Sequence, residues 1–206
     1  MRRNAAVLLL GTIIALVSAA FASPEFADRI YGSFEHVQKK FKTVTIQQYQ
    51  QVAFKFMGAK RQLGDDYPAF EKLAKQLVAI KIEYANEQQQ IDYDALPPEK
   101  RAEAKRVISR IQPLFDRLND DVISSEVFTP EEYDAYIESL LVYETMVARA
   151  GVDPSKGPYG IEAIPEAFRE EYKAAKERWM AFETRMQQLN REKDIREYQQ
   201  KKMQSR

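Results

Sequence analysis

The sequence predicts an all-α protein: an antiparallel helical bundle of five or six helices with a long C-terminal heptad helix, preceded by an N-terminal apolar segment. Three observations predict this class. Apolar residues recur in steps of three and four through most of the 206-residue chain, which is the period of an amphipathic helix. The 7 glycines and 9 prolines are few and clustered, which favours long helices over a turn-rich β fold. Convincing β alternation appears nowhere.

Composition sets limits on the class of protein. With 45% hydrophobic and 30% charged residues, the chain is too apolar for disorder and too charged for a protein that spans a membrane many times. Its 31 basic and 31 acidic residues balance, so we predict no nucleic-acid partner. It has no cysteine, which excludes disulfides, zinc–thiolate sites and thiol nucleophiles.

Residues 1–22 form a signal peptide or a membrane anchor. Arg2 and Arg3 precede an apolar run over residues 5–21, and Ala20 and Ala22 provide small residues for cleavage after Ala22. If the segment stays uncleaved, residues 5–21 contact the membrane, since a helix of that length spans ~26 Å of a hydrocarbon core of ~30 Å. Both readings export the rest of the chain, so we predict a periplasmic location.

Helix-start signals divide the first half of the bundle, residues 23–189. Ser23, followed by Pro24 and Glu25, begins a first helix. A capping box over residues 45–48 opens a second helix that Gly64 ends. Pro68 lies at the start of a third, whose pattern fades into the polar run 86–90.

Two further helices begin at prolines. Pro97, Pro98 and Glu99 open a helix in which Pro113 should cause a kink or a local break in the hydrogen-bond ladder. Residues 128–133 carry the best start signal of the chain, a capping box with proline at the first helical position, and Gly151 ends that helix.

The connection over residues 151–164 is long and unusually apolar. It carries Tyr159, Ile161 and Ile164, which either cover the core beneath the loop or form a docking loop for a partner.

The rest of the chain is organised around the last helix, from Pro165 towards Arg206. Its apolar residues form a heptad seam that needs other helices, or a second copy of the chain, to pack against: Phe168, Tyr172, Ala175, Trp179, Phe182, Met186 and Leu189. Residues 190–206 continue as a charged helical tail. The candidate partner-docking residues combine the loop with the later part of the seam: Tyr159, Ile161, Ile164, Trp179, Phe182, Met186 and Leu189.

Groups suited to catalysis are scarce in this sequence. His36 is the one histidine, and its charged neighbours place it on a solvated helix face. The paired acids Glu131/Glu132 and Glu170/Glu171 lie in first turns of helices, where they offset the helix dipole. We therefore assign no catalytic, cofactor-binding or metal residues, and we predict that the protein is not an enzyme and has no cofactor.

The helix starts carry a family resemblance. Leu96-Pro97-Pro98-Glu99, then Pro113, then Glu126 to Glu131, and finally Ile164-Pro165-Glu166, resemble the repeated helix-start signature of Spy-like periplasmic chaperones and the related periplasmic heavy-metal sensors. The resemblance covers roughly residues 96–179. It implies a small exported protein built from helical hairpins that dimerise. The sensors' metal ligands do not carry over, because the only histidine lies outside the matching region.

Two functions fit these observations. The first is a non-enzymatic exported α-helical scaffold or accessory subunit that docks on a membrane-associated protein complex. The alternative, which the resemblance implies, is a Spy-like periplasmic chaperone or an envelope-stress or metal sensor. Both predict a protein partner, either a membrane complex or a second copy of the chain.

Overall fold

A computed structural model describes residues 28, 30–42, 58–152 and 160–204, and within these ranges every regular element is a helix, which confirms the all-α class. Six α-helices lie wholly within these ranges: α3 (Phe34–Lys40), α5 (Tyr67–Tyr84), α6 (Pro98–Leu118), α7 (Ser124–Val127), α8 (Pro130–Ala150) and α9 (Arg169–Gln204). The predicted N-terminal segment 1–22 and the predicted helix starts at Ser23 and Thr45 lie outside the described residues.

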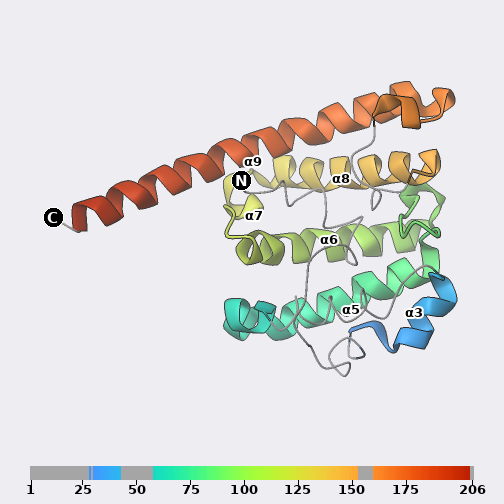
Figure 1. Ribbon diagram of the computed structural model, residues 1–206, viewed down its shortest axis with the longest axis horizontal. Helices are drawn as coiled ribbons and strands as arrows, with labels where there is room; N and C mark the ends of the chain where they lie inside the picture. The colour runs from blue at the N-terminus through green and yellow to red at the C-terminus, as the bar shows by residue number, and fades with distance from the viewer. Residues whose placement is uncertain (1–27, 29, 43–57, 153–159, 205–206) are drawn as a thin grey trace.

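The long helices lie in the order in which they occur in the chain (Figure 1). α5, α6, α8 and α9 are arranged side by side, and the chain reverses direction from each of them to the next. α8 packs on α6 and along α9, and α6 packs on α5. α9, with 36 residues, is much longer than the helix it packs against, so its C-terminal part runs past the end of the bundle (Figure 1).

The predicted boundaries of α8 are confirmed by its caps. The hydroxyl of Thr129 accepts a hydrogen bond from the backbone N–H of Glu132, whose carboxylate accepts one from the backbone N–H of Thr129. This reciprocal pair is the predicted capping box. At the other end Gly151 has φ of +66°, a left-handed conformation that glycine adopts at little cost and that terminates the helix.

α6 continues through Pro113, although proline cannot donate a backbone hydrogen bond. The carbonyl of Ser109, four residues earlier, therefore lacks its normal helical donor. The hydroxyl of Tyr133, on α8, donates to that carbonyl at 2.5 Å. The predicted break in the ladder thus lies at the α6–α8 interface, where a side chain of the neighbouring helix replaces the missing bond.

Two apolar clusters hold the helices together. The larger one joins α3, α5, α6, α8 and the middle of α9, and includes an edge-to-face contact between Phe70 and Phe115. The smaller one joins the end of α8 to the start of α9: Met146, Val147, Ala150, Ile164, Tyr172 and Ala175. α9 is therefore held from its first turns to the level of Met186.

Candidate partner-docking site

The first half of α9 uses its heptad seam against α8. Trp179 is 2% exposed, and its ring stacks on Tyr143 of α8 with ring centres 5.0 Å apart. Farther along, Phe182 contacts the rings of Phe128 and Tyr136. The seam is confirmed as a packing surface, but its partner is α8 of the same chain.

This packing revises the predicted docking set. Ile164, Trp179 and Met186 are buried, so they cannot contact a partner while the fold is intact. Phe182 and Leu189 are partly covered. The prediction listed these residues as docking candidates because a heptad stripe shows that a helix needs a neighbour without showing which helix supplies it.

The loop residues of the predicted set do not form one surface either. Ile161 is 37% exposed, whereas Ile164 is fully buried in the smaller apolar cluster. Tyr159 lies outside the described residues. The sequence allowed this loop either to cover the core or to dock a partner. Ile164 has the first of these roles, because it is part of the core.

The bundle holds α9 four residues beyond the predicted boundary at Leu189. The side-chain amide of Asn190 donates to Asp121 at 2.8 Å and accepts from the backbone N–H of Val122 at 2.6 Å. The amine of Lys193 donates to the carbonyl and to the carboxylate of Asp120, at 2.9 and 2.8 Å. These bonds attach α9 to the turn after α6.

Residues 194–204 of α9, which we name the arm, extend beyond these contacts (Figure 1). Every side chain in the arm is exposed except that of Glu197, which is partly covered. Three of the exposed side chains are large and apolar: Ile195 at 56%, Tyr198 at 68% and Met203 at 70%. They are the most exposed large hydrophobic residues among those the structure describes.

Sequence reasoning placed these three residues in a charged tail and left them out of the docking set. Ile195 and Tyr198 do not continue the seam. The positions that follow Leu189 in the heptad pattern are Lys193, Arg196, Gln200 and Met203, so three polar positions separate Met203 from the rest of the seam. A search for apolar residues beyond Leu189, whether on the seam or off it, would have found all three.

Within the bundle, α9 also carries a buried acid. The carboxylate of Glu183 accepts a hydrogen bond from the hydroxyl of Tyr136 at 3.2 Å. Burial is the largest cause that raises the pKa of Glu183, and the hydrogen bond from Tyr136 opposes it. With the smaller upward effects of the Asp116 and Asp121 charges, the pKa rises to about 7.

A second buried polar cluster joins α5 to α8. The amine of Lys81 lies 3.4 Å from the carboxylate of Glu144, which also accepts a hydrogen bond from the hydroxyl of Tyr93 at 3.0 Å. Burial raises the pKa of Glu144, while Lys81 and the hydrogen bonds oppose the shift. Because both charges are enclosed and paired, the cluster fixes the register of two helices and is closed to a substrate.

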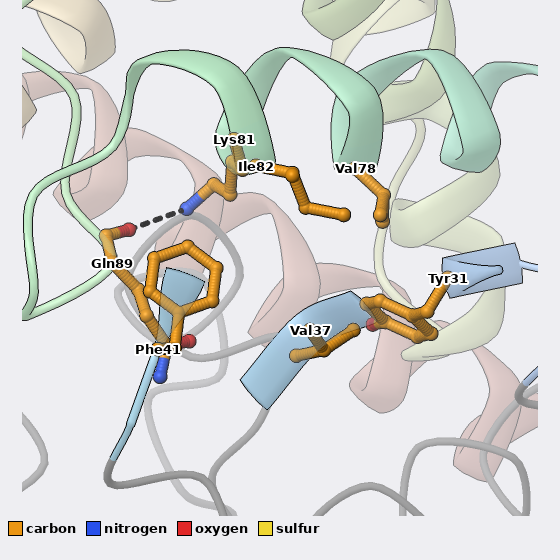
Figure 2. A pocket seen from close by; sticks show the side chains of 7 residues that line it. All are labelled: Tyr31, Val37, Phe41, Val78, Lys81, Ile82 and Gln89. Carbon is orange, nitrogen blue, oxygen red and sulfur yellow. Dashed lines mark hydrogen bonds between the residues drawn. The ribbon is translucent and has the colours of Figure 1, made fainter. Parts of the chain in front are cut away.

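The pocket beside this cluster is small (Figure 2). Its volume is about 20 Å³, enough for one water molecule. The amine of Lys81 points to the backbone carbonyl of Gln89, 3.2 Å away, and the other lining side chains are mostly apolar. The residues that line the pocket are Tyr31, Val37, Phe41, Val78, Lys81, Ile82 and Gln89.

The only histidine of the sequence lies on an exposed helix face, as predicted. His36 is exposed, and its backbone N–H caps α3 by donating to the hydroxyl of Ser33 at 3.1 Å. In the described part of the chain, no group of three or more acidic, histidine or cysteine side chains is arranged to hold a metal ion. None of the described helices is both long and apolar enough to cross a membrane.

These features define an all-helical protein whose long last helix is packed at its beginning and exposed at its end. Residues 25–200 match the model of the family described as Domain of unknown function (DUF3600), and the chain belongs to that family. The matched range includes the bundle and more than half of the arm. None of the curated proteins compared with the chain is similar enough to count as a relative.

Proposed function

We propose that this protein is an exported, non-enzymatic accessory subunit that docks on a membrane-associated protein complex through its arm. The observation that carries the proposal is the exposure of Ile195, Tyr198 and Met203 on a helix that extends beyond the bundle. Exposed apolar side chains on a helix are the anchors that a grooved protein partner binds, and a helix that is already formed loses little entropy on binding.

The charges of the arm favour an acidic partner. The arm carries Arg196, Lys201 and Lys202 against Asp194 and Glu197, and the last seven of its residues contain no acid. Opposite charges around an apolar groove speed association and orient the two surfaces. A second arm is a poor partner, since the same basic residues would face each other.

The N-terminal segment supports the proposed location. Arg2 and Arg3 followed by an apolar run are typical of a segment that enters the export pathway. An uncleaved segment would hold the bundle at the membrane surface, within reach of a membrane complex. N-terminal sequencing of the protein recovered from membranes tests this: Met1 at the start supports an anchored subunit, and Ser23 at the start of a soluble form supports the alternative.

That alternative is a Spy-like chaperone, and one observation favours it. Three prolines of the resembling motifs lie at the starts of helical elements: Pro98 begins α6, Pro130 begins α8, and Pro165 caps the short turn Glu166–Phe168. The assay is aggregation of a chemically unfolded client. Suppression by the purified protein at equimolar amounts, unchanged when residues 194–206 are removed, would favour the chaperone over the docking subunit.

Site-specific photo-crosslinking in intact cells tests the docking proposal. We would place a benzophenone amino acid at Tyr198, and at Ala102, an exposed position on α6, as the matched control. We expect one adduct of defined mass in the membrane fraction from position 198 and none from position 102. The mass of the adduct from position 198 identifies the partner. The double substitution Ile195→Glu and Tyr198→Glu should then abolish binding of that partner without lowering the Tm of the protein. Equal adducts from both positions would refute docking through the arm.

A further inference from the structure

The junction of α8 and α9 contains a carboxylate in an aromatic environment. Glu183 is 7% exposed and lies on α9 beside Phe182. The rings of Phe182, Phe128 and Tyr136 contact one another in pairs, with ring centres 5.5–5.7 Å apart. Such surroundings stabilise a neutral side chain better than a charged one, because rings cannot replace the water that a carboxylate loses on burial.

The groups that face Glu183 come from each packed element. From α8, Tyr136 donates the one hydrogen bond. From α6 comes Asp116, itself buried, and from the turn after α6 comes Asp121, and both acids repel a charge on Glu183. Asp116 already accepts hydrogen bonds from Gln112 and from the backbone and hydroxyl of Ser124.

Two cationic side chains that follow Glu183 on α9, those of Arg185 and Lys193, form ion pairs with other acids. Arg185 pairs with Glu132 of α8 at 2.6 Å and lies over the ring of Phe128. Lys193 pairs with Asp120. An ionised Glu183 is thus held by a single hydrogen bond among rings and like charges, whereas a protonated Glu183 keeps its contact with Tyr136 without burying a charge.

We propose that the α8–α9 seam is a proton-sensitive latch, in which ionisation of Glu183 weakens the attachment of α9 to α8 and exposes the apolar side chains of Trp179, Phe182 and Met186. In the closed latch these three residues are core, as described above. In the open latch they become accessible to solvent on the face of α9 that α8 otherwise covers. The latch involves only residues of the bundle, so it can be tested independently of any partner of the arm.

The direction of the effect follows from linkage. In the closed seam the pKa of Glu183 is about 7, above the ordinary value of 4.5 that applies once the side chain meets water. The closed form therefore binds the proton more tightly, and the seam is most stable below the lower value. Between about pH 5 and pH 7 the opening equilibrium should rise roughly tenfold per pH unit, and above pH 7 it should level off.

Hydrogen exchange of the full-length protein measures this opening directly. After correction for the chemical exchange rate, protection of the amides in residues 176–189 should fall by roughly tenfold per unit between pH 5 and pH 7. Protection in α6 serves as the internal control and should change much less. In Glu183→Gln the protection of residues 176–189 should be nearly independent of pH. The same pH dependence in Glu183→Gln and in the unmodified protein would overturn the latch.

A second variant keeps the test decisive if Glu183→Gln does not fold. Tyr136→Phe removes the hydrogen bond that favours the charged carboxylate, so the pH at which opening levels off should move upward. A merely structural role of Tyr136 would lower protection equally at every pH. His36→Gln, on α3, is the matched control because it replaces the only histidine of the sequence, and it should leave the profile unchanged. A profile that moved with His36 and not with Tyr136 would refute the proposal.

Discussion

The bond between Tyr133 and Ser109 gives the sharpest prediction about the fold. Pro113 deprives the Ser109 carbonyl of its helical donor, and the Tyr133 hydroxyl takes the donor's place from α8. Tyr133→Phe keeps the ring in its contact with Tyr136 and removes only the hydroxyl. The carbonyl then loses the side-chain donor that α8 supplies at a partly buried interface.

The size of the effect depends on whether Pro113 is present. With Pro113 in place, Tyr133→Phe should lower the free energy of unfolding by about 1–3 kcal/mol, the usual effect of leaving a buried polar group unsatisfied. In a Pro113→Ala background, residue 113 regains an N–H that donates to Ser109. In that background Tyr133→Phe should lower the free energy of unfolding by only about 0.5 kcal/mol, since the Ser109 carbonyl keeps a donor. The coupling between the two sites should therefore be about 1 kcal/mol or more.

Urea denaturation, monitored by circular dichroism, measures this coupling in four proteins: the unmodified protein, Tyr133→Phe, Pro113→Ala and the double variant. Tyr198→Phe is the matched control, because the hydroxyl removed there belongs to a side chain that is 68% exposed on the arm. It should change stability by less than about 0.5 kcal/mol. Equal losses from Tyr133→Phe with and without Pro113 would show that the hydroxyl does not replace the missing backbone donor.

Three other changes test the packing by the same denaturation assay. Trp179→Ala should lower stability by about 3–5 kcal/mol in the isolated protein, because the ring is a core group stacked on Tyr143; a small loss would place it outside the core. Lys81→Met should cost about 3–5 kcal/mol by leaving Glu144 buried without its cation. That loss should shrink as the pH falls and Glu144 takes up a proton, and adding Glu144→Gln should recover part of it at pH 7; a pH-independent loss would contradict the pairing. Removal of residues 194–206 should leave Tm nearly unchanged, and a large drop would show that the arm packs on the bundle.

Local signals allowed much of the fold to be predicted. The starts of α6 and α8 follow from Pro98 and from the capping box at Thr129, and the end of α8 follows from Gly151. These features depend on residues a few positions apart, so no knowledge of the rest of the molecule is needed to identify them. The long last helix was predicted for the same reason, since its heptad pattern runs from Phe168 to Leu189.

The candidate site was harder to predict because it depends on which helices meet. The seam residue Trp179 shows only that α9 needs a neighbour, and the identity of that neighbour is decided by contacts with Tyr143, 36 positions away. The buried pair of Lys81 and Glu144 is separated by 63 positions, and nothing local distinguishes either residue from a surface charge. The exposed residues of the arm were left out of the docking set because Ile195 and Tyr198 fall off the heptad pattern and polar positions separate Met203 from the rest of the seam.

Buried acids lie at three joints of the bundle, that is, at three contacts between helices, and their charges are compensated to different extents. Glu144, between α5 and α8, has a cation and a tyrosine as partners. Asp116, between α6 and α7, accepts three hydrogen bonds. Glu183, between α8 and α9, accepts one, and among the described residues it has no ion pair. The weakest compensation of a buried charge therefore lies at the attachment of the helix that carries the arm. A fold selected only for rigidity would place an apolar residue at this buried position, beside the seam residue Phe182. The acid found there is what the proposed latch requires, so we expect the attachment of α9 to α8 to weaken before the other two joints as the pH rises towards neutrality.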